Sequence, residues 1–404
     1  MPLKDILSFL VRLLLFRSRG EQRRTLFEFE TRFSQRYDLP QGVCFSKARV
    51  AFYFLMKHLG LKPGGEVLIS AIHVADFVNM IRLAGFKPVV VDLLPNAYTL
   101  DPEDLERKIN SHSALILVTH LCGYATDMDR IMEISKRHQV PFIEDCSQAL
   151  SARHNGRPLG VFGRAAIFSL SLLKPVCTLS GGMVISNDTA LLDRLRQEAL
   201  ALPEAKKEPL VLEAVKNIVI RTAVNPVLFQ AVVFPLMRLA MPLGDFFAKY
   251  QKTNRTVILR ESMPKGFLVK FLWQQAAMGL SQLATVEARE RERAGYGVSL
   301  YERLKSCPSL RLPPVAELGA NSFWLFPVLV KDPDKLKRFL ASKGVDSSKF
   351  LLSLLGAEKA FAQYKFECEA AACIKEHTLF IPMYGTLGRD RLDSMARVIE
   401  NFKG

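Results

Sequence analysis

The sequence contains few cysteines, and their spacing predicts neither a metal site nor a set of disulfides. Seven cysteines are scattered among 404 residues. None belongs to a Cys-x-x-Cys pair, and the closest two, Cys368 and Cys373, have no histidine at zinc-ligand spacing to both. This usage is typical of a reducing compartment and predicts no structural metal.

Motifs for nucleic-acid binding are also missing. The chain has no helix-turn-helix, zinc-finger or RNA-binding signature, although its net charge is +15 and its pI is near 9.5. Without such a motif, a basic excess of this size favours an anionic membrane surface or an anionic substrate. We therefore expect no nucleic-acid partner.

No apolar run is suited to crossing a membrane, which takes about 20 residues. Near the N-terminus, apolar residues recur at three- and four-residue spacing among basic side chains, which predicts an amphipathic helix. The run continues directly into Arg17-Ser18-Arg19, without the small-residue cleavage site of a signal peptide. Two interpretations stay open, a helix lying in a membrane interface and a helix packed on a partner subunit. The apolar residues are Leu3, Ile6, Leu7, Leu10, Val11, Leu14 and Leu15.

A second apolar segment lies within residues 203–262. Its uncharged run, residues 222–237, is interrupted by Pro226 and Pro235, which argues against one continuous spanning helix. The pattern predicts two short interfacial helices or a hydrophobic substrate lid, and burial in a dimer interface is the alternative.

The sequence does contain short apolar runs that end in polar residues. Residues 141–143 precede Glu144 and Asp145, and residues 165–168 precede Ser169. Such runs, bounded by Gly and Pro, predict buried strands, and the loops after them carry reactive groups in α/β proteins. Between residues 41 and 140 strand and helix patterns alternate, which predicts a mostly parallel sheet covered on both faces.

These polar residues suit catalysis with pyridoxal phosphate. That cofactor needs a lysine to hold its aldehyde as a Schiff base and a carboxylate against its pyridine nitrogen. It also needs hydroxyl and backbone N–H groups around its phosphate. Lys174, Asp145 and Ser169 supply one candidate for each role.

The order of these residues resembles the DegT/DnrJ/EryC1/StrS family of sugar aminotransferases. The chain reads IEDCSQA, GVFGR, FSLSLLK and LSGGM in the family's order, and GLKPGGEVLI and FIPMYGTLGRDRLDSMARVIENF also match. The resemblance covers roughly residues 41–187 and 264–402. It implies an α/β fold of type I, with a large domain built on a mostly parallel sheet and a smaller α+β C-terminal domain. We expect an amphipathic helical segment at 1–40, the cofactor-binding domain at 41–202, a hydrophobic insertion at 203–262, and a linking helix with the small domain at 263–404.

The resemblance also implies roles for individual residues. Lys174 would hold the cofactor and shuttle a proton, Asp145 would protonate the ring nitrogen, and Gln148 would hydrogen-bond the ring hydroxyl. Ser169 and the turn of Ser46, Lys47 and Ala48 would hold the phosphate, and His73 could stack on the ring.

The chain departs from the family pattern at several positions. Lys47 and Ala48 replace a glycine and a threonine, and Val74 stands where the family has an aromatic residue. Leu268 and Lys270 occupy an Asn-x-Arg element that reaches the neighbouring subunit's cofactor in the family's dimers.

The implied function is transfer of an amino group, typically from glutamate, to the keto carbon of a nucleotide-linked sugar by a homodimer. The apolar segments suggest a cytoplasmic enzyme at the inner membrane face, where a lipid-linked sugar or a keto-lipid would be the acceptor. Related dehydratases have histidine in place of the Schiff-base lysine, so Lys174 argues against that activity. A non-catalytic membrane-associated scaffold or regulator remains the alternative.

Overall fold

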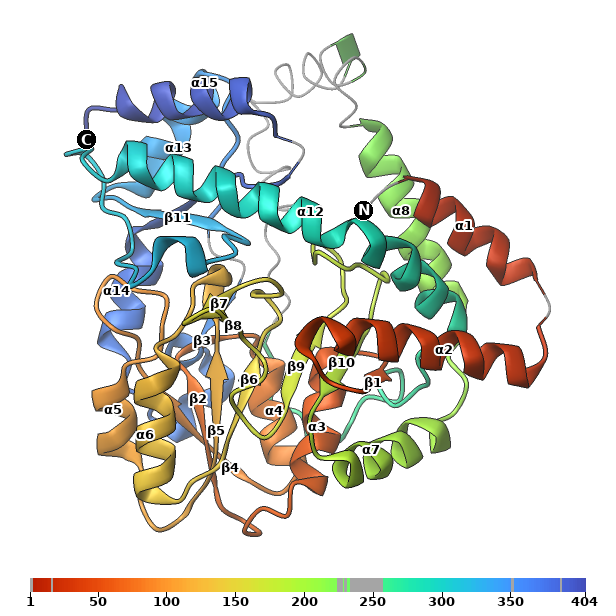
Figure 1. The fold of residues 1–404 in the computed structure, drawn as a ribbon. Helices are drawn as coiled ribbons and strands as arrows, with labels where there is room; N and C mark the ends of the chain where they lie inside the picture. The colour runs from red at the N-terminus through yellow and green to blue at the C-terminus, as the bar shows by residue number, and fades with distance from the viewer. Residues whose placement is uncertain are drawn as a thin grey trace.

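A computed structural model of the chain describes residues 3–15, 17–223, 228, 231–232, 257–349, 352–385 and 387–404. At its centre is a seven-stranded sheet in the order β1-β10-β9-β6-β5-β2-β4 (Figure 1). β10 runs antiparallel to both of its neighbours, and the remaining pairs are parallel. The sheet confirms the predicted α/β class. Its strands are β1 (Gly42–Phe45), β2 (Glu66–Ser70), β4 (Lys87–Val91), β5 (Ser113–Thr119), β6 (Phe142–Asp145), β9 (Ala166–Ser169) and β10 (Gly182–Ile185).

Helices cover both faces of this sheet, so successive residues of a strand are buried on opposite sides. In β5, Leu115 and Leu117 join one core, whereas Ile116 and Val118 join the other. The first core includes α3 (Ala48–His58), α4 (Asp76–Leu83) and α7 (Thr189–Ala201). The second includes α2 (Arg19–Ser34), α5 (Pro102–Lys108) and α6 (Met128–His138). Burial on both faces explains why the strands read as continuous apolar runs rather than alternating ones.

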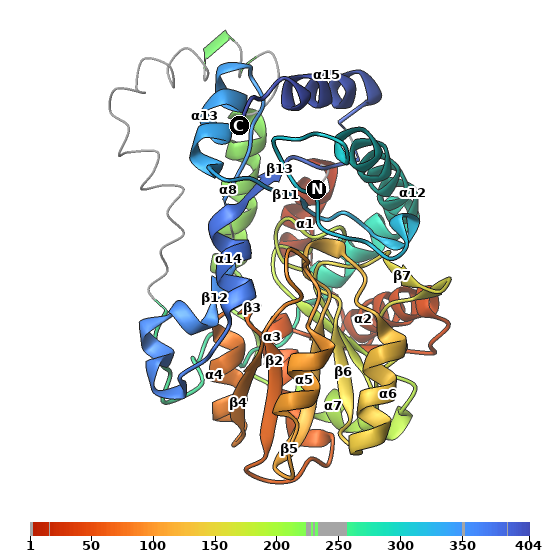
Figure 2. The ribbon, with the colours of Figure 1, turned by 90° about the vertical axis from the view of Figure 1, so that its left-hand side faces the viewer.

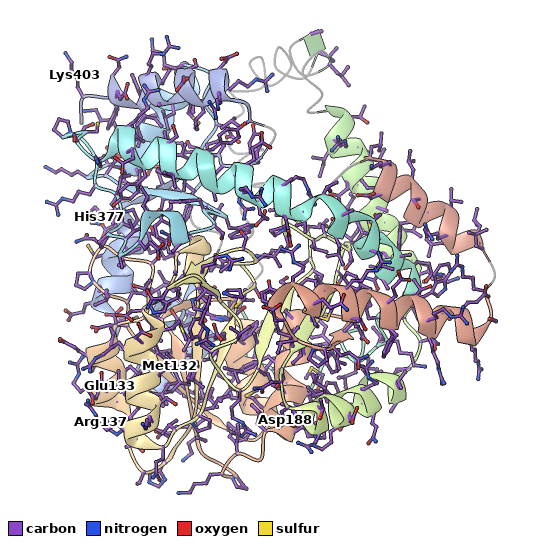
Figure 3. The ribbon with its side chains drawn as sticks, viewed as in Figure 1. Met132, Glu133, Arg137, Asp188, His377 and Lys403 are labelled. Atoms are coloured by element: carbon purple, nitrogen blue, oxygen red, sulfur yellow. The ribbon has the colours of Figure 1, made fainter. Side chains whose placement is uncertain are left out.

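Helix α6 illustrates how the sequence fixes these helices. Asp127 caps its N-terminus by accepting a hydrogen bond from the backbone N–H of Arg130 at 3.2 Å. Its outer face carries Glu133 and Arg137, which form an ion pair at 2.5 Å (Figure 3). Gln139, with φ of 56°, ends the helix in the left-handed conformation. Charged residues outside and apolar residues inside therefore orient α6 on the sheet.

The C-terminal part of the chain forms a smaller domain that packs on the long helix α12 (Trp273–Leu304). The linking helix predicted here is one 32-residue helix that runs from α1 to the small domain (Figure 1 and Figure 2). Close packing at its C-terminal half requires Gly297, because a Cβ there would lie 2.3 Å from the Phe323 ring. The other elements of this part are β11 (Phe326–Leu329), α13 (Pro333–Ser342), β12 (Ser353–Leu354), α14 (Glu369–His377), β13 (Thr378–Ile381) and α15 (Arg389–Glu400).

Two further helices, α1 (Leu3–Leu14) and α8 (Glu208–Ala223), pack against each other beside the start of α12 (Figure 1). The predicted N-terminal helix is therefore present. Most of the predicted apolar run at 222–237 lies outside the described residues. Among the helices that the structure describes, none combines the length and the apolarity that a membrane crossing requires.

Candidate active site

A cavity of about 230 Å³ lies at the carboxyl end of the parallel strands. Thr119, Asp145 and Ser169 end β5, β6 and β9, so the strand register brings them to one edge of the sheet. The cavity wall contains seven of the eight site residues predicted from the sequence, namely Lys47, Ala48, His73, Asp145, Gln148, Ser169 and Lys174. Ser46 is the exception, since its hydroxyl donates to the backbone carbonyl of Phe267 at 2.5 Å.

Asp145 presents a buried negative charge to this cavity. Its Oδ2 lies 3.2 Å from Nε2 of His73, and its Oδ1 accepts the backbone N–H of Ser147 at 2.9 Å. Burial acts to raise the pKa of Asp145, but His73 and Ser147 outweigh it and the pKa falls below its ordinary value. The carboxylate therefore stays ionised although it is buried.

His73 is held by the chain on both sides. Its strand β3 (Ile72–His73) pairs with β12 from the C-terminal part, where Ser353 lies opposite His73. Its ring lies against Phe77, with the ring centroids 4.3 Å apart. Nδ1 of His73 is buried and has no hydrogen-bond partner among the described residues. A buried polar atom of this kind on a cavity wall is suited to a polar ligand.

Lys174 faces the same cavity from the loop after β9. Leu173, with φ of 68°, turns the chain immediately before it. Burial, aided by the positive charge of Arg293, lowers the pKa of Lys174 to about 8, although the negative charge of Asp145 opposes this change. A substantial fraction of the side chain is then the neutral amine near neutral pH.

Trp324 is a site residue that the sequence analysis missed. Nζ of Lys174 lies 3.7 Å from the centroid of the Trp324 ring, and Nε1 of Trp324 donates to the Leu173 carbonyl at 2.9 Å. The ring thus fixes both the lysine side chain and the loop that carries it. Because 150 residues separate Trp324 from Lys174, no local pattern in the sequence could have revealed this pairing.

Gln148 follows β6 and faces the cavity with a fixed amide. Its Oε1 accepts the backbone N–H of Cys122 at 2.8 Å. Nε2 is therefore the donor that this side chain can offer to a ligand.

The N-terminus of α3 forms the opposite end of the cavity. Lys47 is the N-cap residue and makes no side-chain capping bond to the helix, and its Nζ lies 3.4 Å from Oγ of Ser180. Strand β10 comes so close that a Cβ on Gly182 would lie 2.4 Å from the backbone nitrogen of Ala48. Ser169 and Ser171 add hydroxyl groups, 2.9 Å apart. First-turn N–H groups, hydroxyls and a lysine together suit a phosphate.

These donor groups fit pyridoxal phosphate. Asp145 offers a carboxylate to the ring nitrogen, Lys174 an amine to the aldehyde, and the α3 N-terminus a cradle to the phosphate. Oγ1 of Thr119, on the same wall, is also buried without a hydrogen-bond partner among the described residues. The cavity therefore has the polar groups that this cofactor requires.

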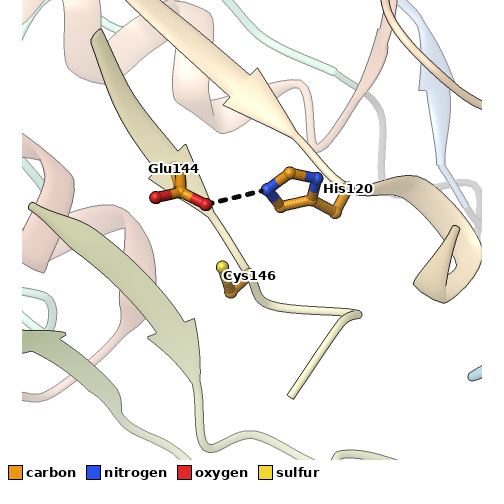
Figure 4. A group of neighbouring side chains, drawn as sticks. All are labelled: His120, Glu144 and Cys146. Atoms are coloured by element: carbon orange, nitrogen blue, oxygen red, sulfur yellow. Dashed lines mark hydrogen bonds and ion pairs between the residues drawn. The ribbon is translucent and has the colours of Figure 1, made fainter. Parts of the chain in front are cut away.

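A neighbouring cluster of His120, Glu144 and Cys146 has ligand atoms close enough for a metal ion, yet its contacts are structural (Figure 4). The two carboxylate oxygens of Glu144 accept the backbone N–H groups of Gly160, Phe162 and Gly163 at 2.7 to 3.0 Å. Oε2 also lies 3.3 Å from Nε2 of His120. Burial raises the pKa of the Cys146 thiol, which disfavours the thiolate that a metal would need. The cluster ties the loop at 160–163 to β6.

The departure at Lys270 is also visible. Its Nζ forms an ion pair at 2.8 Å with Oε1 of Glu204 in the same chain. Lys270 therefore has an ion-pair partner within its own chain.

Comparison with known proteins gives one family for most of the chain. A model of the DegT/DnrJ/EryC1/StrS aminotransferase family matches residues 15–207 and 247–402. The GDP-perosamine synthase of Escherichia coli O157:H7 is 32% identical over 167 residues, which make up 41% of this chain and 46% of that protein. The GDP-perosamine synthase of Caulobacter vibrioides is 27% identical over 333 residues, or 80% of this chain and 75% of that protein.

The same fold is found among solved structures. The crystal structure of AtS13 from Actinomadura melliaura superposes with a TM-score of 0.76 at 19% identity, covering 100% of this chain and 99% of that one. At 19% identity, this similarity shows a shared fold alone.

Proposed function

The chain belongs to the DegT/DnrJ/EryC1/StrS aminotransferase family, whose members are pyridoxal phosphate enzymes, and from this premise we propose that it transfers an amino group to a keto-sugar. The observation that carries the proposal is the placement of Lys174 and Asp145 on the wall of one cavity, with the α3 N-terminus at its other end. An aminotransferase needs these three features together. A sheet of the same topology can form without them, so they point to the reaction and not merely to the fold.

Each residue has one task in this proposal. When bound, pyridoxal phosphate supplies an aldehyde and an electron-accepting ring. Nζ of Lys174 would hold the aldehyde of the bound cofactor, and its amine would take and return the proton at the reacting carbon. The Asp145 carboxylate holds a proton on the ring nitrogen, and Nε2 of Gln148 donates to the ring hydroxyl. His73 would lie against the ring, while Lys47, Ala48 and Ser169, with the Ser46 backbone, would hold the phosphate.

A nucleotide-linked keto-sugar is the acceptor we propose, with glutamate as the amino donor. Support comes from the two GDP-perosamine synthases, whose names describe a product that is itself a nucleotide-linked amino sugar. The basic balance of the chain is compatible with substrates that carry phosphate groups.

A lipid-linked keto-sugar or a keto-lipid is the second candidate acceptor. It is favoured by the exposed apolar side chains of α1, which include Val11 and Leu14. This candidate places the enzyme on the inner face of a membrane. In either case we propose a homodimer, because the family's dimers place the active site at the subunit interface.

The half-reaction with glutamate tests the proposal and separates it from a non-catalytic scaffold. Purified protein should show the visible absorbance band of bound cofactor, and glutamate should bleach that band with release of 2-oxoglutarate. Borohydride should fix the cofactor on the peptide that contains Lys174. A protein that binds no cofactor, or carries the label on another lysine, contradicts the proposal. GDP-linked and lipid-linked keto-sugars, offered as acceptors, then distinguish the two candidates.

A further inference from the structure

Helices α1 and α8 expose a row of large apolar side chains. In α1 these residues are separated by three or four positions, so they share one face of the helix. The same spacing occurs in α8. Their exposed fractions lie between 39% and 87%, unlike those of most apolar residues in the described core. We name as the α1–α8 surface the residues Leu3, Leu7, Val11, Leu14, Leu15, Leu212, Val215, Val219 and Ile220.

The opposite faces of both helices are packed in a small core of their own. Ile6 and Phe9 from α1 meet Leu210 and Ala214 from α8, together with Met278 from α12. Oδ1 of Asp5 also accepts a hydrogen bond from Oγ of Ser281 at 3.1 Å. The two helices are thus fixed in place, and their exposed apolar faces are not an effect of loose attachment.

The residues that the family model matches, 15–207 and 247–402, leave both helices out, since α1 ends at Leu14 and α8 begins at Glu208. Two segments that are separate in sequence therefore pack side by side (Figure 1). Neither contributes a residue to the cavity wall. Exposed apolar side chains of this kind, on packed helices that lie apart from the cavity wall, indicate a binding role separate from the active site.

The charges around this surface indicate the chemistry of its partner. Lys4 and Arg12 lie on α1, and Lys206 and Lys207 precede α8, which also carries Lys216. On α8 itself the charges balance, since Glu208 and Glu213 match Lys216 and Arg221, and Glu213 is paired with Lys216 at 3.2 Å. The basic excess comes from α1 and from Lys206 and Lys207. Lys207 reaches the Leu13 carbonyl at 3.5 Å, between the two helices. Basic residues beside an apolar face complement anionic lipid headgroups above an acyl layer.

We infer that the α1–α8 surface binds an anionic phospholipid bilayer and inserts its apolar side chains into the interface. Neither helix is long and apolar enough to cross a bilayer, so both lie along it. Two weakly inserting helices on one rigid surface bind together more firmly than either alone, because the second engages at high effective concentration.

The core beneath this surface lies against the active-site loop. Leu172 and Leu179, on either side of Lys174, pack against the core that joins α1 to α8. Binding to a membrane would therefore hold the loop close to the lipid. This inference does not depend on the identity of the acceptor.

Co-sedimentation of the full-length holoenzyme with vesicles tests the inference. The probes are vesicles of phosphatidylcholine alone and vesicles containing phosphatidylglycerol, each at low and high salt. We expect binding to the anionic vesicles, with a part lost at high salt and a part that only detergent releases. The double variants Val11→Ser/Leu14→Ser and Val219→Ser/Ile220→Ser should each weaken binding about tenfold or more, since two apolar side chains no longer insert.

A matched control is Leu94→Ser/Leu200→Ser, which removes exposed apolar side chains elsewhere on the described surface and should bind vesicles like the wild type. The visible cofactor absorbance reports that each variant is folded. Wild-type protein that remains in the supernatant with anionic vesicles at low salt overturns the inference. So does a loss of dimer mass by light scattering in the α1 and α8 variants, because the surface is then covered by a second copy.

Discussion

The protonation of Lys174 gives a direct test of the electrostatics of the active site. Its pKa is lowered to about 8 from 10.5 because burial disfavours the ammonium form. At this value about 10% of the side chain is neutral amine at pH 7, about half at pH 8 and about 90% at pH 9. An ordinary lysine with a pKa of 10.5 is less than about 1% neutral at pH 8.

Competitive acetylation of the cofactor-free enzyme measures this fraction. Acetic anhydride modifies only the neutral amine, and mass spectrometry quantifies the peptide that contains Lys174 as the pH rises. Exposed Lys359 serves as the internal reference for reagent reactivity. We expect the reactivity of Lys174 to rise about tenfold between pH 7 and pH 9 and then to level off.

The substitution Asp145→Asn tests the cause of the shift. The negative charge of Asp145 stabilises the ammonium form, so its removal should move the midpoint for Lys174 to a lower pH. Glu367→Gln removes an exposed carboxylate of the C-terminal part and should leave the midpoint unchanged. A wild-type midpoint near 10, or a midpoint that moves upward in Asp145→Asn, would refute the reasoning.

Three further predictions concern the cofactor. Asp145→Asn should retain the fold, with unchanged circular dichroism, but lose on the order of 100-fold in turnover, because a neutral partner no longer holds the ring proton; near-normal turnover contradicts this role. Gly182→Ala should weaken cofactor binding and cost about 1–3 kcal/mol in unfolding free energy, since its Cβ would lie 2.4 Å from the Ala48 nitrogen, whereas Gly266→Ala meets no atom within 4 Å. Lys47→Ala should raise the cofactor's Kd by about tenfold at low salt and by less at high salt, and an unchanged Kd at low salt would remove Lys47 from the phosphate site.

Local sequence patterns were enough to predict most strands and helices of the large domain. Residues 113–119 and 142–145 form β5 and β6 because they are buried on both faces, and such strands read as continuous apolar runs. The placement of Asp145 and Ser169 at strand ends follows from the same runs. The needs of the cofactor and the family resemblance assigned both residues to one site, and the parallel strands bring them together because they end at one edge of the sheet.

Contacts between distant segments could not be predicted in this way. The turn that contains Ser46 was expected at the phosphate, but the Ser46 hydroxyl bonds to the carbonyl of Phe267, which lies 221 residues away. The pairing of His73 with Ser353 likewise depends on how the C-terminal part packs on the sheet. The division of the chain at residues 40, 202 and 262 stays a prediction, because α12 crosses from one layer to the other without a break.

The position of Lys174 depends on this packing as well as on its own strand. Trp324 holds the lysine, and the adjacent Ser322 donates its N–H to the Gly123 carbonyl at 2.8 Å, next to β5. The contact is close, since a Cβ on Gly123 would lie 2.3 Å from Oγ of Ser322. A hinge motion of the small domain about this point would have to break this hydrogen bond and, at the same time, move Trp324 away from Lys174. Substrate entry is therefore expected to leave the segment at 321–325 docked on the large domain, and the lysine loop with it.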